Sequence, residues 1–153
     1  MKGLVAFSFA SGAIEPSLCN RRLARAVERI LDKEKEEVVV IAQWEIASST
    51  WASLACVVKE HRQKGAYLDS DEVMAQAARV FNERGITKVI PVANPFLHLA
   101  KCRTLVRDAG FTPIKQKIGW IGFYRESLQW WTRGPFRLLL YAVLIKLTGR
   151  RGR

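Results

Sequence analysis

The chain has 153 residues, of which 49% are hydrophobic and 25% are charged, and its formal net charge is +11. This composition is typical of a globular domain and excludes a disordered chain. The length corresponds to about one domain. No stretch of about 18 residues lacks a charge, which argues against a standard membrane-spanning helix, and the short apolar start lacks the layout of a signal peptide.

Apolar runs alternate with helical patterns from the first residues onward. Residues 4–10 predict a buried strand, because this apolar run ends in a Ser-Gly loop. Ser17 is a good N-cap for a helix that continues to about Leu31. Residues 38–42 include four β-branched side chains in succession, which is typical of a central parallel strand buried on both faces.

The alternation continues to the end of the chain. Ser70 is expected to cap a helix that Gly85 ends, and Pro91 is expected to cause a bulge or a local break in its strand. Gly134 and Pro135 should break the helical C-terminal segment. The expected elements are a helix over 47–61, a strand over 66–68, a helix over 70–84, a strand over 88–93, a helix over 96–108, a strand over 114–123 and helical structure over 126–148.

This order predicts an α/β protein, a three-layer α/β/α sandwich around a mostly parallel, Rossmann-like sheet with right-handed crossovers. We assign residues 1–124 to the α/β domain and residues 125–153 to a basic, aromatic-rich, helical C-terminal extension. Cys19, Cys56 and Cys102 are far apart and form no CxxC pair. They therefore argue against a disulfide framework or a zinc site and favour a cytoplasmic location, the inner face of the membrane included.

Ligands of open α/β sheets bind beyond the carboxyl ends of the strands, so polar residues that follow the predicted strands are site candidates. No dinucleotide, P-loop, nucleophile-elbow or HExxH motif is present, and no cofactor is indicated. The candidates in the predicted loops are Ser11, Gly12, Gln43, Glu45, Asp69, Ser70, Glu72, Asn94 and His98.

His98 is the strongest single candidate. It shares a predicted helical face with Cys102 and Val106, so it should point toward the sheet from the first turn of its helix. The positive helix end there favours a neutral imidazole. A histidine bonded to a backbone carbonyl is the alternative. For Asp69 and Glu72 the alternative is ordinary charge at a helix start, and for Glu45 it is a solvated loop acid.

Several short motifs surround these candidates: Pro16-Ser17, Arg22-Leu23, the loop 43–47, the segment 69–72, the segment 98–102 and Gly110-Phe111. In their order, these motifs resemble the YdcF-like family. The resemblance spans roughly residues 4–124, as in a diverged member: Lys101 and Cys102 stand where the family has arginine and alanine, and the loop at Gln43 lacks a glycine pair.

The resemblance implies a crevice that binds or acts on a phosphorylated or lipid-linked small molecule in bacterial envelope processes. His98 and Glu45 would then be catalytic, Lys101 and Arg22 would neutralise charge, and Glu45 with Asp69 or Glu72 would orient groups or hold a divalent ion. Ligand contacts would come from Ser11, Gly12, Arg22, Asp69, Ser70, Glu72, Asn94 and Lys101. The alternative is a non-catalytic module with a degenerate crevice that docks on a membrane or a protein through its C-terminal segment.

The C-terminal segment has its own character. Residues 115–153 hold nine Lys and Arg against one acid, together with seven of the fifteen aromatic residues. The apolar run 138–145 would be about 12 Å long as a helix, well short of a bilayer core of ~30 Å. It either packs on the sheet or a second subunit, or lies on an anionic membrane. Nucleic acid is the least favoured partner, since no base-reading motif is present. The expected membrane contacts are Trp130, Trp131, Arg150 and Arg151.

Overall fold

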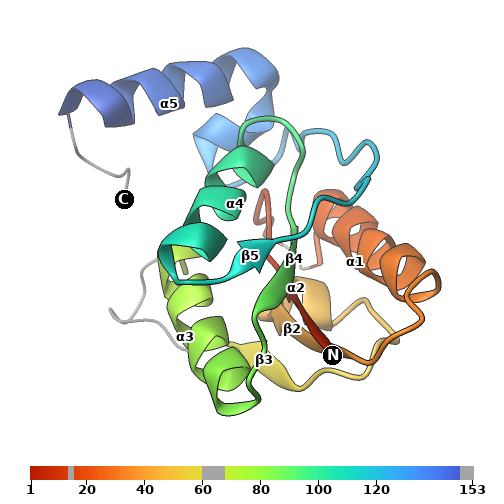
Figure 1. Ribbon diagram of the computed structural model, residues 1–153. Coiled ribbons are helices and arrows are strands. Elements are labelled where there is room, and N and C mark those ends of the chain that lie inside the picture. Colours follow the sequence, from red (N-terminus) through yellow and green to blue (C-terminus); the bar gives the residue numbers. More distant parts are fainter. Residues whose placement is uncertain (14–15, 60–67, 149–153) are drawn as a thin grey trace.

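The computed structural model describes residues 1–13, 16–59 and 68–148 (Figure 1). Five parallel strands in this part of the chain form one sheet in the order β3-β2-β1-β4-β5. This confirms the predicted α/β sandwich around a parallel sheet. The strands are β1 (Lys2–Ala6), β2 (Val38–Gln43), β3 (Cys56–Val58), β4 (Lys88–Val92) and β5 (Thr112–Pro113).

The helices cover both faces of the sheet. Helices α1 (Leu18–Leu31) and α2 (Trp44–Ala47) lie on one face, and α3 (Ser70–Glu83) and α4 (His98–Asp108) lie on the other (Figure 1). The chain leaves β1 toward one face and β4 toward the other, so the topological switch point lies between these two strands. A short 3-10 helix η1 (Trp130–Arg133) and helix α5 (Pro135–Thr148) follow the sandwich.

The core is tightly packed where β1 passes under α3. Gly3 lies in β1, and a Cβ atom built on it would be 2.7 Å from Cε1 of the fully buried Phe81. The Phe81 ring also packs edge-on against Phe111 at 5.7 Å. Because the ring is held on both sides, it has little room to move away.

We therefore expect Gly3→Ala to lower the free energy of unfolding by about 1–3 kcal/mol, the usual cost of overpacking a core. Urea denaturation would measure it. Gly134→Ala is the matched control, because a Cβ atom at Gly134 meets nothing within 4 Å. Equal midpoints for both variants and the parent protein would contradict this packing.

Two of the predicted elements are wrong. Among residues 47–59, only Ala47 is helical, and Cys56–Val58 pairs with β2 as strand β3. The hydroxyl side chains of residues 48–50 compete for backbone hydrogen bonds and end the helix early. The predicted strand over 114–123 is also wrong, since the strand ends at Pro113. Gly119 and Gly122 have φ values of +85° and +83°, which interrupt an extended run.

Three further predictions differ in detail or fall outside the description. Pro91 continues β4 without a bulge, paired with Val5. The Pro91 nitrogen faces the β5 side of the strand, the same side as the Val89 carbonyl, which accepts a hydrogen bond from Ile114 N. Because β5 has ended before it reaches Pro91, no strand acceptor there lacks a backbone N–H donor. The helix cap is Asp69 rather than Ser70. Of the predicted strand 66–68, residues 66 and 67 lie outside the described residues.

Candidate functional site

The loops after β1 and β4 meet at the switch point, where open α/β sheets bind ligands. Each loop contains a non-glycine residue in the left-handed region, Ala10 with φ +66° and Leu97 with φ +60°. Such conformations persist only when surrounding contacts hold them. The side chain of Asn20 holds the first loop by accepting a hydrogen bond from Phe9 N at 2.8 Å, and the Leu99 amide donates to the Asn94 carbonyl at 2.9 Å in the second.

His98 points inward, as predicted. Its ring lies 5.8 Å from Phe9 and 6.3 Å from Phe7, measured between ring centroids. Nε2 is 3.0 Å from Oγ of Ser70 at the start of α3. Nδ1 is buried and makes no hydrogen bond to any residue in the described part of the chain. The predicted alternative, a bond to a backbone carbonyl, is therefore not found among these residues.

The surroundings of His98 keep its ring neutral. Burial, together with the nearby Lys101 ammonium, lowers the pKa of His98 to about 3. Burial also raises the pKa of the Cys102 thiol, which lies beside Ser70. An imidazole with this pKa is a weak base near neutral pH, where a general base works best with a pKa close to the ambient pH. Ser70, His98 and Cys102 therefore form a neutral polar link between α3 and α4.

The predicted acids have structural partners of their own. Asp69 accepts a hydrogen bond from Glu72 N at 2.9 Å, and the Glu72 carboxylate accepts one from Asp69 N at 3.0 Å, which makes a capping box. Glu45 is buried and accepts from Gln43 Nε2 at 3.3 Å. The described residues contain no group of three or more His, Cys, Asp or Glu side chains that could hold a metal ion.

Gln43 is one of the candidates after the second predicted strand, and the sequence analysis assigned it no structural role. Its side chain is buried at the carboxyl end of β2, where it accepts from Ser8 N at 3.0 Å and donates to Leu68 O and Glu45 Oε1, both at 3.3 Å. It therefore ties the loop after β1 to helix α2 and to the segment before α3. The available signal was a polar side chain at the end of a fully apolar strand.

Two predicted ligand-binding residues bind the backbone of the chain instead. The Arg22 guanidinium donates to Ile121 O at 3.0 Å, and the Asn94 amide donates to Gly122 O at 2.8 Å. A Cβ atom at Gly122 would lie 3.0 Å from the Arg22 guanidinium, and its φ of +83° also favours glycine. These side chains hold the segment after β5 across the carboxyl edge of the sheet.

The same segment covers the first loop. The Ser11 carbonyl accepts from Leu128 N at 2.9 Å and from Ser127 Oγ at 3.0 Å. Phe123 packs edge-on against Phe9, with ring centroids 6.0 Å apart. Gly12, which follows Ser11 in the same loop, is buried. Residues 121–128 thus cover the loops at the switch point.

Helix α5 presents three different sides. Leu138 is its one buried residue, and Tyr141 stacks on Trp131 of η1 with ring centroids 4.5 Å apart. A second side, with Leu139 and Val143, faces α4. The third side is a stripe of four apolar residues at helical spacing, whose exposed fractions are 85%, 53%, 41% and 78% for Phe136, Leu140, Leu144 and Leu147. We call these four residues the apolar stripe.

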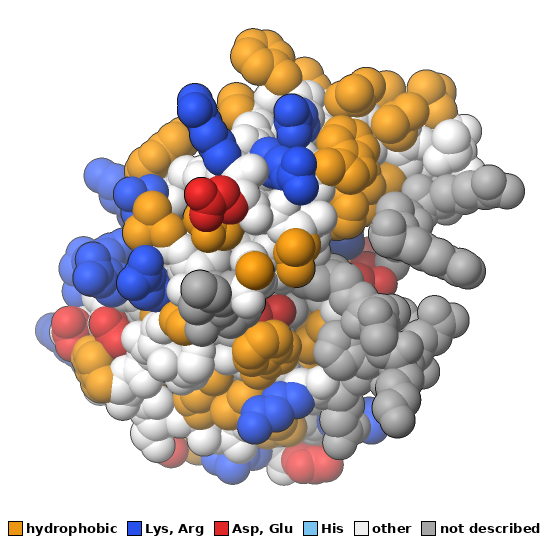
Figure 2. All heavy atoms as spheres, turned by 180° about the vertical axis from the view of Figure 1, so that it is seen from behind, with side chains coloured by type: hydrophobic (Ala, Val, Ile, Leu, Met, Phe, Trp, Pro, Cys, Tyr) orange, Lys and Arg blue, Asp and Glu red, His pale blue; other side chains and the backbone are white. Residues whose placement is uncertain are grey.

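Basic side chains flank the apolar stripe. Arg125, Arg133 and Arg137 surround a hollow of about 290 Å³ at the start of α5, where the first turn has no acidic residue. The positive helix end adds to their charge. Hydrophobic side chains gather at the upper right of Figure 2, where α5 lies, with basic side chains close by. Trp130 is partly exposed beside them, whereas Arg150 and Arg151 lie outside the described residues.

Helix α5 has 14 residues, and no described helix is long and apolar enough to cross a membrane. A scan against protein-family models finds none that matches the chain, and a search of curated proteins finds no match. The resemblance to the YdcF-like family therefore stays a prediction.

Proposed function

We propose that the protein is a peripheral membrane-binding module that attaches to anionic lipid surfaces through α5. The observation that carries this proposal is the apolar stripe, exposed on a helix whose own charged residues, Arg137 and Lys146, are both basic. From residue 127 to the end, the sequence holds six Lys and Arg and no acid. Soluble monomers rarely expose contiguous apolar patches of this kind unless the patch binds something.

The energetics favour an orientation with α5 in the membrane interface. An interfacial helix buries its apolar face about 5–10 Å into the boundary between headgroups and acyl chains. Each basic residue near an anionic leaflet adds on the order of 1 kcal/mol, and this contribution decreases with salt. The three-arginine hollow at one end of α5 and Lys146 at the other would place cations at headgroup level along the whole helix.

Charge favours a membrane over a second copy of the chain. A symmetric dimer through the apolar stripe would bring two copies of Arg133, Arg137 and Lys146 together, and like charges facing each other oppose association. An anionic bilayer satisfies both the apolar and the basic side chains. Nucleic acid would satisfy only the basic ones.

The predicted ligand-binding residues at the switch point support a function less well than α5 does. Action on a phosphorylated or lipid-linked small molecule, as the resemblance implies, would need Ser11, Arg22 and Asn94 to reach a ligand. These residues contact residues 121–128 instead. His98 has a pKa of about 3, which makes it a poor base. The module with a degenerate crevice is therefore the better supported proposal.

Vesicle flotation of the full chain tests the proposal. We expect binding to vesicles of phosphatidylcholine with one quarter phosphatidylglycerol, and weaker binding to phosphatidylcholine alone. Raising the salt from about 0.1 M to about 0.5 M shortens the Debye length and should release part of the protein. Recovery of the protein in the soluble fraction with both kinds of vesicle would contradict the proposal.

A further inference from the structure

The groove between α4 and α5 combines an apolar lining with two lysine side chains. It has a volume of about 500 Å³, within the range of roughly 300–1,000 Å³ typical of small-molecule sites. Its walls are mostly apolar, and two lysines and a threonine supply the polar groups. The lining residues are Leu97, Ala100, Lys101, Thr104, Leu139, Ala142, Val143 and Lys146.

We infer that this groove binds one anionic phospholipid, with its phosphate between Lys101 and Lys146 and its acyl chain along Leu97, Leu139 and Val143. This inference rests on the proposed membrane binding, which brings the groove to the lipid surface. It adds a defined headgroup site to a helix that would otherwise only partition into the interface.

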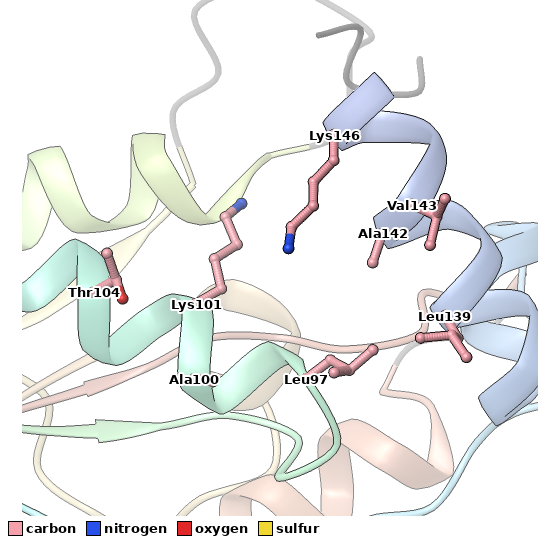
Figure 3. A pocket seen from close by; sticks show the side chains of 8 residues that line it. All are labelled: Leu97, Ala100, Lys101, Thr104, Leu139, Ala142, Val143 and Lys146. Carbon is pink, nitrogen blue, oxygen red and sulfur yellow. The ribbon is translucent and has the colours of Figure 1, made fainter. Parts of the chain in front are cut away.

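The two ammonium groups carry the argument for an anion. Both lysine side chains extend into the space between the helices, one from α4 and one from α5 (Figure 3). Lys146 makes no salt bridge to any residue in the part of the chain that the structure describes. An ammonium on each wall can donate to the oxygens of one phosphate, which a single lysine could not hold as well.

One acid opposes the anion and also supplies a test. Asp71 Oδ2 lies 3.2 Å from Lys101 Nζ, with the two side chains 27% and 45% exposed. Exposed ion pairs of this kind are weak, so the Lys101 ammonium can still turn toward a phosphate. Removing the Asp71 charge should therefore strengthen lipid binding, whereas removing either lysine should weaken it.

The apolar wall distinguishes a lipid from a free phosphate. Leu97 directly precedes α4 and Leu139 lies on α5, both at the same end of the groove, and Val143 follows Leu139 by one helical turn (Figure 3). Inorganic phosphate would use only the lysines. A lipid would gain from both walls, so its affinity should exceed that of inorganic phosphate at equal concentration.

The experiment uses dihexanoyl phosphatidic acid below its critical micelle concentration, titrated into the full chain by calorimetry. Inorganic phosphate and dihexanoyl phosphatidylcholine are the comparison ligands, and vesicle flotation runs in parallel. The variants are Lys101→Met, Lys146→Met and Asp71→Asn. Lys88→Met is the matched control, because Lys88 is an exposed lysine at the opposite, amino-terminal edge of the sheet.

We expect saturable binding of one phosphatidic acid per chain, roughly tenfold weaker in each groove-lysine variant, about two- to fivefold tighter in Asp71→Asn, and unchanged in Lys88→Met. Equal binding by the lysine variants and the parent protein would overturn the inference, as would vesicle binding without any binding of the short-chain lipid. Short-chain binding without vesicle binding would keep the groove site and overturn the membrane proposal. Inorganic phosphate binding as tightly as the lipid would overturn the apolar part of the site.

Discussion

Replacing Leu140 and Leu147 with glutamate in the full chain should reduce partitioning into anionic vesicles by roughly 100-fold. These residues are seven positions apart on α5 and belong to the apolar stripe, with 53% and 78% of their surface exposed. The two substitutions forgo about 3 kcal/mol of apolar burial in the lipid. The added carboxylates would also be repelled by the anionic headgroups. Vesicle flotation over a range of lipid concentrations would measure the effect.

The fold should not respond to this double substitution, because neither side chain is part of the core. Thermal unfolding midpoints should agree with that of the parent protein. Trp51→Glu is the matched control, since Trp51 is 67% exposed and its amide bonds to Glu28 of α1, away from α5. Vesicle binding lost equally in the control and the α5 variant would show that α5 is not the contact surface.

The sheet could be predicted from the sequence because the residues of an inner strand and the cap of the helix after β1 form clear sequence patterns. β2 starts with four β-branched residues in succession, and the helix after β1 follows Ser17, whose side chain caps it by accepting from Asn20 N at 3.3 Å. The helix predicted over 47–61 failed for the converse reason. Its apolar residues suit a helix or a strand equally, and only the pairing of Cys56–Val58 with β2 decides between them.

The site was only partly readable. The sequence analysis correctly predicted that the loops after β1 and β4 lie at one edge of the sheet and that His98 points inward. It could not show that residues 121–128 would fold over the same edge, because the contacts use backbone atoms of Ile121, Gly122 and Leu128. Backbone acceptors and donors are present in every residue and leave no pattern. The basic and aromatic-rich character of the C-terminal segment, by contrast, could be seen from composition alone.

The His98 imidazole should make the free energy of unfolding depend on pH in a defined window. The folded pKa of His98 is about 3 and lies below the ordinary value of 6.5, so the unfolded chain binds a proton that the folded chain does not. Stability from this residue is therefore full above pH 6.5 and is lost as the pH falls toward 3. Between pH 7 and pH 5 the loss should be about 2 kcal/mol.

Urea denaturation of the parent protein and of His98→Phe at pH 7, 6 and 5 would measure this dependence. Phenylalanine keeps a ring against Phe7 and Phe9 but cannot titrate, so the variant should lose about 2 kcal/mol less than the parent protein over that range. Ser70→Ala is the matched control, because it removes the hydrogen bond to Nε2 and leaves the imidazole in place. It should lower stability at every pH and keep the slope of the parent protein. If the free energy of unfolding of His98→Phe depends on pH as steeply as that of the parent protein, the His98 ring takes up its proton in the folded state as readily as in the unfolded chain. The proposed neutral link between α3 and α4 would then be wrong.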